Sequence, residues 1–326
     1  MANEELLEGI RARRQLWGKR DSTVRASLQL IKMQDNIQLH NRQAITIATS
    51  EPRAQFNLAT HMLSWTPEVI RLPVTSQDLA QRREMGLAER AAVGMWKQNT
   101  DWQRMRGNPS WRVQSARHLL LGFAATEWDI RLTPDGQPQF IAIPWNPMSV
   151  YPDFGGPDKE LIACDYTYTI TRDALRRAVA YNEGWQMPRA MERSERAPIR
   201  IIKHYETDGV NVSMAVVANE AGDNEDIIMP LTYQPHMTEI PVVIMPIFDI
   251  DDMTSDTPNI DGFLMRNETN YKRLNLFMSE QMDVAHLNAY RSVQITSSTG
   301  RTTVDKEQLR GEVIPTTPDV MFNPIQ

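Results

Sequence analysis

The chain has 326 residues, more than one hydrophobic core usually holds, so we expect two or three subdomains. Hydrophobic residues make up 41% of it and charged residues 23%, which excludes a disordered or fibrous protein. The net charge of −6 excludes a protein that holds DNA tightly along its whole surface, because like charges would repel the phosphate backbone. Any contact with nucleic acid must therefore be local or loose.

The single cysteine and the N-terminal residues limit the chemistry and the compartment. One cysteine forms neither a disulfide framework nor a multi-cysteine zinc site within a chain, so we interpret Cys164 as a buried structural thiol in a strand. Residues 1–15 are charged where a secretion signal would be apolar, and no stretch approaches the roughly 20 apolar residues that a bilayer span requires. We expect a soluble, intracellular protein that makes no membrane contact.

Helices are predicted in the N-terminal third. Spaced apolar positions over the first forty residues indicate surface helices with a break near Gly18. Thr75 opens the sequence TSQD, which matches a capping box and predicts a long helix to about Arg106. The sequence GNP then ends that helix and starts another, with Pro109 at its first position and its end near Gly122.

Strand patterns dominate the middle of the chain. Two extended runs joined by residues 134–136, Pro-Asp-Gly, predict a hairpin because Gly supplies the positive φ of a tight turn. A strand over 161–170 leads into a helix opened by Thr171, and residues 184–198 look irregular. The pair Asp-Gly at 208–209 separates two further runs and predicts a second hairpin; IIMPLTYQP and EIPVVIMPI add two strands.

A helix expected from Pro258 onward has the clearest periodicity in the protein. Apolar and amide side chains recur on it at alternating steps of four and three: Ile260, Leu264, Asn267, Tyr271, Leu274, Met278, Gln281 and Ala285. Asn267 and Gln281 are unusual on such a face, because a buried amide needs hydrogen-bond partners and so favours a defined register, often between chains. We interpret this face as seeking a neighbouring subunit.

Five aspartates precede that helix and could bind a hard cation through oxygen ligands: Asp249, Asp251, Asp252, Asp256 and Asp261. The fifth and sixth positions of a calcium loop need an acid or amide and a Gly, but counting from Asp249 they hold Met253 and Thr254. We therefore predict no metal site, and interpret the segment as a solvated hinge where Asp256 or Thr257 caps the helix and Pro258 enters its first turn. A metal-dependent nuclease built on Asp249–Asp256 is the alternative.

Residues 96–117 raise a second alternative. Three tryptophans interleave there with five basic residues, a composition that single-strand binders use for stacking and phosphate contact: Trp96, Trp102, Trp111, Lys97, Arg104, Arg106, Arg112 and Arg117. Indole rings on an amphipathic helix are usually core or interface anchors, with the arginines on the wet face. A nucleic-acid-binding module using this segment stays open.

No catalytic motif accompanies these features. The six histidines are scattered, and HExxH, GxSxG, GxxxxGK[ST] and GxGxxG are all missing from the sequence. The run SSTGRTT at 297–303 has hydroxyls, a Gly and an Arg that could meet a phosphate, although this composition is typical of a loop. We predict that the chain is not an enzyme and has no catalytic residue, metal or cofactor.

Several stretches resemble the portal proteins of tailed bacteriophages in order and spacing. The family's helix that ends at Gly before a long strand is similar to HLLLGFAATEWDI, and its proline-flanked strand and corner to IPWNPMSVYPDF. Its strand, acidic loop and stem-type helix are similar to residues 239–275, where Pro241, the Ser-Asp at 255–256 and Asn270 sit as such sequences commonly have them. Residues 293–320 resemble the segment that then leads into the central tunnel.

The resemblance implies an α+β portal fold with five parts. These are a wing of helices and a β-hairpin (1–170), a helix with an irregular connector (171–197), a β-rich clip-like or wing sheet (198–247), an acidic turn with a stem-type helix (248–290), and a tunnel-loop region that begins a C-terminal part (291–326). Portal chains usually continue into a tunnel helix and a helical crown, whereas this sequence stops at FNPIQ. We therefore expect a truncated chain or a missing crown.

The resemblance also implies a dodecameric ring at one capsid vertex, with a channel for DNA packaging and ejection. The implied partners are further copies of the chain, double-stranded DNA in the channel, the terminase large subunit, a head–tail adaptor protein and the major capsid protein. The implied location is the virion's portal vertex, with the host cytoplasm during assembly. The candidate tunnel-loop residues are Ser297, Ser298, Thr299, Gly300, Arg301 and Thr302, and the candidate subunit-interface residues are Ile260, Leu264, Asn267, Tyr271, Leu274 and Met278.

Overall fold

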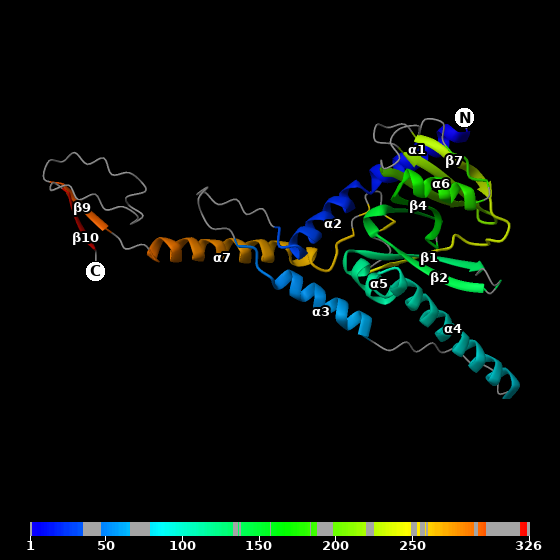
Figure 1. Ribbon diagram of the computed structural model, residues 1–326, viewed down its shortest axis with the longest axis horizontal. Coiled ribbons are helices and arrows are strands. Elements are labelled where there is room, and N and C mark those ends of the chain that lie inside the picture. The colour runs from blue at the N-terminus through cyan, green and yellow to red at the C-terminus, as the bar shows by residue number, and fades with distance from the viewer. Residues whose placement is uncertain are drawn as a thin grey trace. The chain divides into compact units, whose positions relative to one another are not determined.

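The computed structural model shows an α+β protein in which helices and antiparallel strands alternate in groups along the chain (Figure 1). It describes residues 2–34, 47–65, 79–132, 136, 138–156, 158–182, 184–187, 198–219, 225–248, 253–254, 258, 260–289, 293–297 and 320–324. The chain divides into two compact units. The first consists of Met1–Gln29 and Arg53–Arg266, and the second of Leu30–Pro52 and Asn267–Gln326.

Most of the helices begin in the N-terminal part: α1 (Ala2–Leu16), α2 (Gly18–Ile31), α3 (Glu51–Trp65), α4 (Leu79–Met105) and α5 (Trp111–Leu120). The predicted break near Gly18 is confirmed, and so is the long helix from residue 79 onward; its predicted start at Thr75 lies outside the described residues. The prediction that Pro109 opens α5 is wrong by two residues. Ser110 has extended backbone dihedrals as the N-cap, so helical geometry starts only at Trp111.

A five-stranded antiparallel meander forms the larger sheet. Its strands lie in chain order: β3 (Val150–Gly155), β4 (Glu160–Thr171), β5 (Pro198–Thr207), β6 (Val212–Asn219) and β7 (Glu225–Tyr233). The hairpin predicted at 208–209 is confirmed, since Thr207 pairs with Val212. The helix predicted after Thr171 is also confirmed: α6 (Arg172–Tyr181) begins where the Thr171 hydroxyl accepts a hydrogen bond from the amide of Ala174, 3.3 Å away.

A three-stranded antiparallel sheet has the order β2-β1-β8, with β1 at Phe123–Leu132, β2 at Pro138–Trp145 and β8 at Val242–Pro246. Pairing of Leu132 with Pro138 confirms the hairpin predicted at 134–136. The β-rich run 198–247 supplies strands to both sheets, because β5–β7 continue the meander whereas β8 pairs with β1. Its predicted lower boundary therefore falls between two strands, β4 and β5, that are hydrogen-bonded neighbours.

The meander is apolar on both faces because side chains alternate along its strands. On one face Ile202, Ala215 and Val217 pack with Leu6 and Ile10 of α1. The opposite face packs against Leu175 of α6 and contains Ile199, Ile201, Val216, Ala218 and Ile228. A third cluster joins the two sheets through Trp17, Phe123, Trp145, Cys164 and Tyr205. Cys164 is fully buried in β4, as predicted, and burial raises the pKa of its thiol.

The second unit contains a long helix and a β-ribbon. Helix α7 (Glu268–Ala289) follows a single 3₁₀ turn, η3 (Met265–Asn267), and the strands β9 (Val293–Ser297) and β10 (Val320–Pro324) pair antiparallel. The buried Asn275 side chain accepts hydrogen bonds from the Thr49 amide (2.8 Å) and hydroxyl (2.7 Å). One turn later, the Ser279 hydroxyl accepts from the Ile47 amide at 2.8 Å. These bonds attach the segment 47–49 to one side of α7.

We expect Gly122→Ala to destabilise the first unit by about 1–3 kcal/mol. Gly122 has φ +142°, and a Cβ there would lie 2.9 Å from Cγ2 of Ile260, so the substitution combines backbone strain with a steric clash. The matched control is Gly94→Ala in the interior of α4, where a Cβ meets nothing within 4 Å and helix propensity should add about 0.5–1 kcal/mol of stability. Urea unfolding measures both, and equal midpoints for the two variants would contradict the prediction.

Candidate functional site

The structure tests little of the predicted tunnel loop. Ser297 is the last residue of β9 and pairs with Val320. The other members, Ser298, Thr299, Gly300, Arg301 and Thr302, lie outside the described residues. The tunnel-facing role of this loop therefore stays a prediction.

The acidic segment is only partly described. Asp249, Asp251, Asp252 and Asp256 lie outside the described residues, and Asp261 is exposed. Over the part of the chain that the structure covers, no three His, Cys, Asp or Glu side chains converge as a metal ion would require. The prediction that Asp256 or Thr257 caps the long helix is wrong, because α7 begins at Glu268.

The helix starts late because its predicted first turns bury their side chains elsewhere. Ile260 and Leu264 are almost fully buried, and Ile260 packs in the core cluster beside Gly122. The amide of Phe263 donates to the carbonyl of Leu120 at 2.8 Å. In an α-helix the same amide would donate to a carbonyl four residues earlier in the helix. The prediction that Ile260 and Leu264 lie on the interface face of the long helix is therefore wrong. Both residues precede α7 and belong to the core of the first unit.

Of the remaining members of that face, Asn267 lies in the turn η3, and the others share one side of α7 but differ in burial. Tyr271 is buried and Leu274 half-buried, whereas Asn267, Met278, Gln281 and Ala285 are exposed. The buried amide is instead Asn275, which lies with Ser279 on the side that binds residues 47–49. The sequence signal that was missed is the pair of polar side chains four residues apart, Asn275 and Ser279.

Four apolar side chains of α7 are exposed, with charged side chains such as Arg273 and Glu280 exposed beside them. We call the four residues Leu276, Phe277, Met278 and Met282 the α7 apolar face, and their side chains are 38–55% exposed. Exposed positions of a helix in a water-soluble protein are normally polar or charged. The exposed residues of α3 show a similar stripe at steps of four and three, formed by Leu58, Met62 and Trp65.

Two of the three tryptophans in residues 96–117 are packing anchors. Trp96 of α4 and Trp111 of α5 have ring centroids 4.5 Å apart, and Trp96 meets Trp128 of β1 edge-on at 5.2 Å. Their ring faces are thereby used inside the protein, as the packing interpretation predicts. Trp102 differs, since the guanidinium of Arg106 lies over its ring at 3.9 Å. This arrangement weakens the case for a base-stacking surface.

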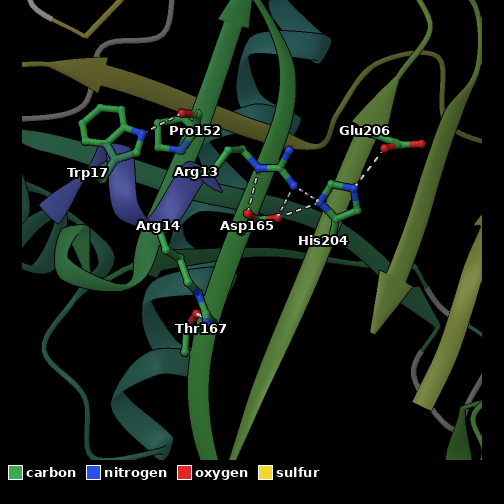
Figure 2. Close-up of polar contacts among 8 residues, drawn as sticks. All are labelled: Arg13, Arg14, Trp17, Pro152, Asp165, Thr167, His204 and Glu206. Atoms are coloured by element: carbon green, nitrogen blue, oxygen red, sulfur yellow. Dashed lines mark hydrogen bonds and ion pairs between the residues drawn. The ribbon is translucent and has the colours of Figure 1, made fainter. Parts of the chain in front are cut away.

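A polar network links α1 to two strands of the meander through four charged side chains of the first unit (Figure 2). Arg13 forks onto Asp165 of β4, with Nε 2.8 Å from Oδ2 and Nη2 3.2 Å from Oδ1. His204 of β5 lies 2.6 Å from Asp165 Oδ1 through Nδ1 and 3.2 Å from Glu206 Oε2 through Nε2. Asp165 and His204 are both completely buried. We call these four residues the α1 anchor.

The Asp165 carboxylate determines where the protons point in the α1 anchor. A carboxylate oxygen only accepts, so His204 Nδ1 and Arg13 Nη2 both donate to Asp165 Oδ1, and Nη2 lies 3.1 Å from Nδ1. His204 Nε2 then donates to Glu206 when the ring is charged. Burial lowers the pKa of His204, but the hydrogen bonds to Asp165 and Glu206 outweigh it and the pKa is raised. The same bond to His204 lowers the pKa of Glu206.

The α1 anchor attaches α1 to the meander and lies beside a small pocket. A pocket of about 260 Å³ beside it is lined by Glu5, Leu6, Gly9, Arg13, His204, Glu206 and Leu231. The His–Asp pair has the composition of a catalytic base, but none of the lining residues is a Ser, Thr or Cys that it could activate. Arg13 and His204 instead hold α1 against the sheet through one shared carboxylate.

The α1–α2 junction is attached to residues 147–152 by hydrogen bonds from side chains to backbone carbonyls. The Trp17 indole donates to the Pro152 carbonyl at 2.9 Å, and Arg20 donates to the carbonyls of Pro147 and Val150 at 2.6 and 2.7 Å. Arg14 points away from Arg13 and donates to the Thr167 hydroxyl at 2.8 Å (Figure 2). Consecutive arginines on α1 thus contact different parts of the sheet.

Comparison with known proteins gives no further constraint: no protein-family model matches this chain, and no curated protein is significantly similar to it. Within the described ranges, none of the helices combines the length and the apolar composition needed to cross a bilayer.

We expect the protein to lose stability as the pH rises above neutrality. The folded-state pKa of His204 is raised above 6.5, so its contribution is complete below 6.5 and is lost as the pH rises through the folded value. Each unit of that elevation is worth about 1.4 kcal/mol. Urea midpoints between about pH 6 and 9 should fall for the wild type and stay nearly flat for His204→Gln. The exposed His236→Gln is the control, and a wild-type slope retained in H204Q would contradict the assignment.

Proposed function

We propose that the chain is a subunit of a closed ring of identical copies, the portal protein at one vertex of a tailed-bacteriophage capsid. The observation that carries the proposal is the α7 apolar face, which the described part of the chain leaves exposed. Contiguous exposed apolar surface marks interaction sites in soluble proteins. A head-to-tail contact between copies that closes on itself would bury this face in every subunit.

The position of α7 in the chain supports the same proposal. The helix follows the acidic segment in the place of the stem-type helix of portal proteins, and the ribbon β9–β10 comes after it. One side of α7 is already occupied by residues 47–49 through Asn275 and Ser279. The exposed apolar side chains of α7 take no part in these bonds, which suits contact with a neighbouring copy of the same helix or of the exposed α3 stripe.

In this proposal double-stranded DNA passes through the ring, and the terminase large subunit, a head–tail adaptor and the major capsid protein contact its outer surfaces. The acidic net charge fits a conduit, since a channel that repels phosphate lets DNA slide where a basic channel would grip it. A motor that hydrolyses ATP would be a separate protein, and we assign no catalytic role to this chain.

The test is electron cryo-microscopy of the purified protein without imposed symmetry, together with light scattering during size-exclusion chromatography. We expect rings with a central hole wide enough for duplex DNA. Phe277→Asp places a charge in the α7 apolar face, where the side chain is 55% exposed in the single chain, and should give monomers that remain folded. The control is Glu280→Gln, an exposed position on the same helix, which should still form rings.

Two results would oppose the proposal. A protein that stays monomeric at every concentration tested would contradict the proposed ring. Magnesium-dependent cleavage of plasmid DNA that is abolished by Asp251→Ala and Asp252→Ala would favour the nuclease alternative instead.

A further inference from the structure

A second pocket in the first unit gathers basic side chains from three separate elements. Its volume is about 490 Å³, within the range of roughly 300–1,000 Å³ typical of small-molecule sites. Arg14 comes from α1, Arg25 from α2 and Arg200 from β5, and none of the residues that line the pocket is an Asp or Glu. Three guanidiniums around one space repel each other, so an anion bound between them would be strongly favoured.

The pocket lies on the face of the meander that α1 covers. Arg200 is the cross-strand partner of Thr169, and Thr167 lies two residues earlier on the same face of β4. Both threonines line the pocket, and Thr167 accepts a hydrogen bond from Arg14. Because the adjacent Arg13 is fixed on Asp165, the α1 anchor also sets the position of Arg14. The basic groups are thus presented by a supported framework.

The acidic residue Asp21 acts on the pocket wall but is not among the residues that line the pocket. Asp21 acts on the Tyr151 phenol in the pocket wall, but its carboxylate is engaged by Arg20 through Nε at 2.8 Å and Nη2 at 2.7 Å. The Tyr151 ring lies against two guanidiniums, with the Arg14 and Arg20 carbons 5.7 and 5.1 Å from its centroid. Its face is therefore occupied and does not offer a stacking platform for a nucleobase.

We propose that this pocket binds the phosphate groups of a small phosphorylated ligand. Guanidinium forks match phosphate oxygens in pairs, and the threonine hydroxyls add donors around them. A single carboxylate has only about four acceptor sites, which is fewer than the number of N–H donors on three guanidiniums. A chain of phosphates presents acceptor oxygens along its whole length and can therefore pair with more of these donors. The site is independent of ring formation, since every residue that forms it belongs to the first unit of one chain.

Isothermal titration calorimetry with inorganic tripolyphosphate tests the proposal. Arg25→Gln and Arg200→Gln remove exposed pocket charges without emptying a core, and each should weaken binding about tenfold or more, the loss of one charge-assisted pair. Arg177→Gln on α6, also exposed but outside the pocket, should leave the affinity unchanged. Unchanged circular dichroism melting curves would show that the variants stay folded.

Competition experiments identify the source of the phosphate. Displacement of tripolyphosphate by ATP assigns the pocket to nucleotides, whereas tripolyphosphate binding that ATP does not displace assigns it to inorganic polyphosphate; both results support phosphate recognition. Citrate binding as tight as tripolyphosphate, wild-type affinity in R25Q and R200Q, or no detectable binding of tripolyphosphate at low salt would each overturn the proposal.

Discussion

Asp165→Ala is expected to destabilise the first unit by about 3–5 kcal/mol, the usual cost of removing one partner from a buried ion pair. Asp165 is completely buried and is the shared acceptor of Arg13 and His204. Its removal leaves the Arg13 guanidinium without its carboxylate and the buried His204 ring without the acceptor of its Nδ1 proton. Equilibrium urea unfolding followed by circular dichroism measures the loss.

The control for this variant is Asp101→Ala. Asp101 also pairs with an arginine, Arg104, but at 3.9 Å and with both side chains about 70% exposed. Exposed pairs of this kind contribute little, so D101A should unfold almost as the wild type does. An Asp165→Ala variant no less stable than D101A would show that the α1 anchor does not hold the helix.

Trp17→Ala should also cost about 3–5 kcal/mol, because it empties a fully buried indole site at the junction of α1 and α2. The indole packs against Phe123 with ring centroids 6.1 Å apart, and the buried Arg20 guanidinium lies 4.8 Å from its ring. Loss of the ring therefore creates a cavity and uncovers a charge. Thermal unfolding reports both effects as one decrease in Tm.

One further variant separates packing from hydrogen bonding at Trp17, and a second variant, at an exposed tryptophan, is the control. Trp17→Phe keeps most of the ring but loses the bond to the Pro152 carbonyl, so it should cost about 1–3 kcal/mol, the penalty of an unsatisfied buried acceptor. Trp65→Ala removes an indole that is 74% exposed, and should leave the stability of the chain within about 0.5 kcal/mol of the wild type. A loss at Trp17 no larger than at Trp65 would contradict the core assignment.

Local signals in the sequence identified much of the fold. The Pro-Asp-Gly and Asp-Gly turns place both predicted hairpins correctly, because positive φ at Gly is a requirement of the turn itself. Thr171 marks the start of α6 for the same kind of reason, since its hydroxyl binds an amide three residues away. In each case the cause lies within a few residues of the effect.

Long-range pairing explains what the sequence did not reveal. Periodicity suggested a helix from Pro258, but Ile260 lies beside Gly122 and the Phe263 amide donates to the Leu120 carbonyl, more than a hundred residues away in the chain. The α1 anchor is equally hidden, because Asp165 and His204 become neighbours only through the β4–β5 register. Scattered histidines and arginines have no spacing that reveals such partners. The same is true of Arg14, Arg25 and Arg200.

The order in which the chain is synthesised has a consequence for the α1 anchor. Arg13 leaves the ribosome long before its partners, which lie 152 and 191 residues later in the chain. Until β4 and β5 emerge and pair, Arg13 lacks the buried carboxylate of Asp165, and a charged side chain without such a partner stays in water. The α1 anchor therefore cannot form before β5 has left the ribosome, late in the synthesis of the first unit.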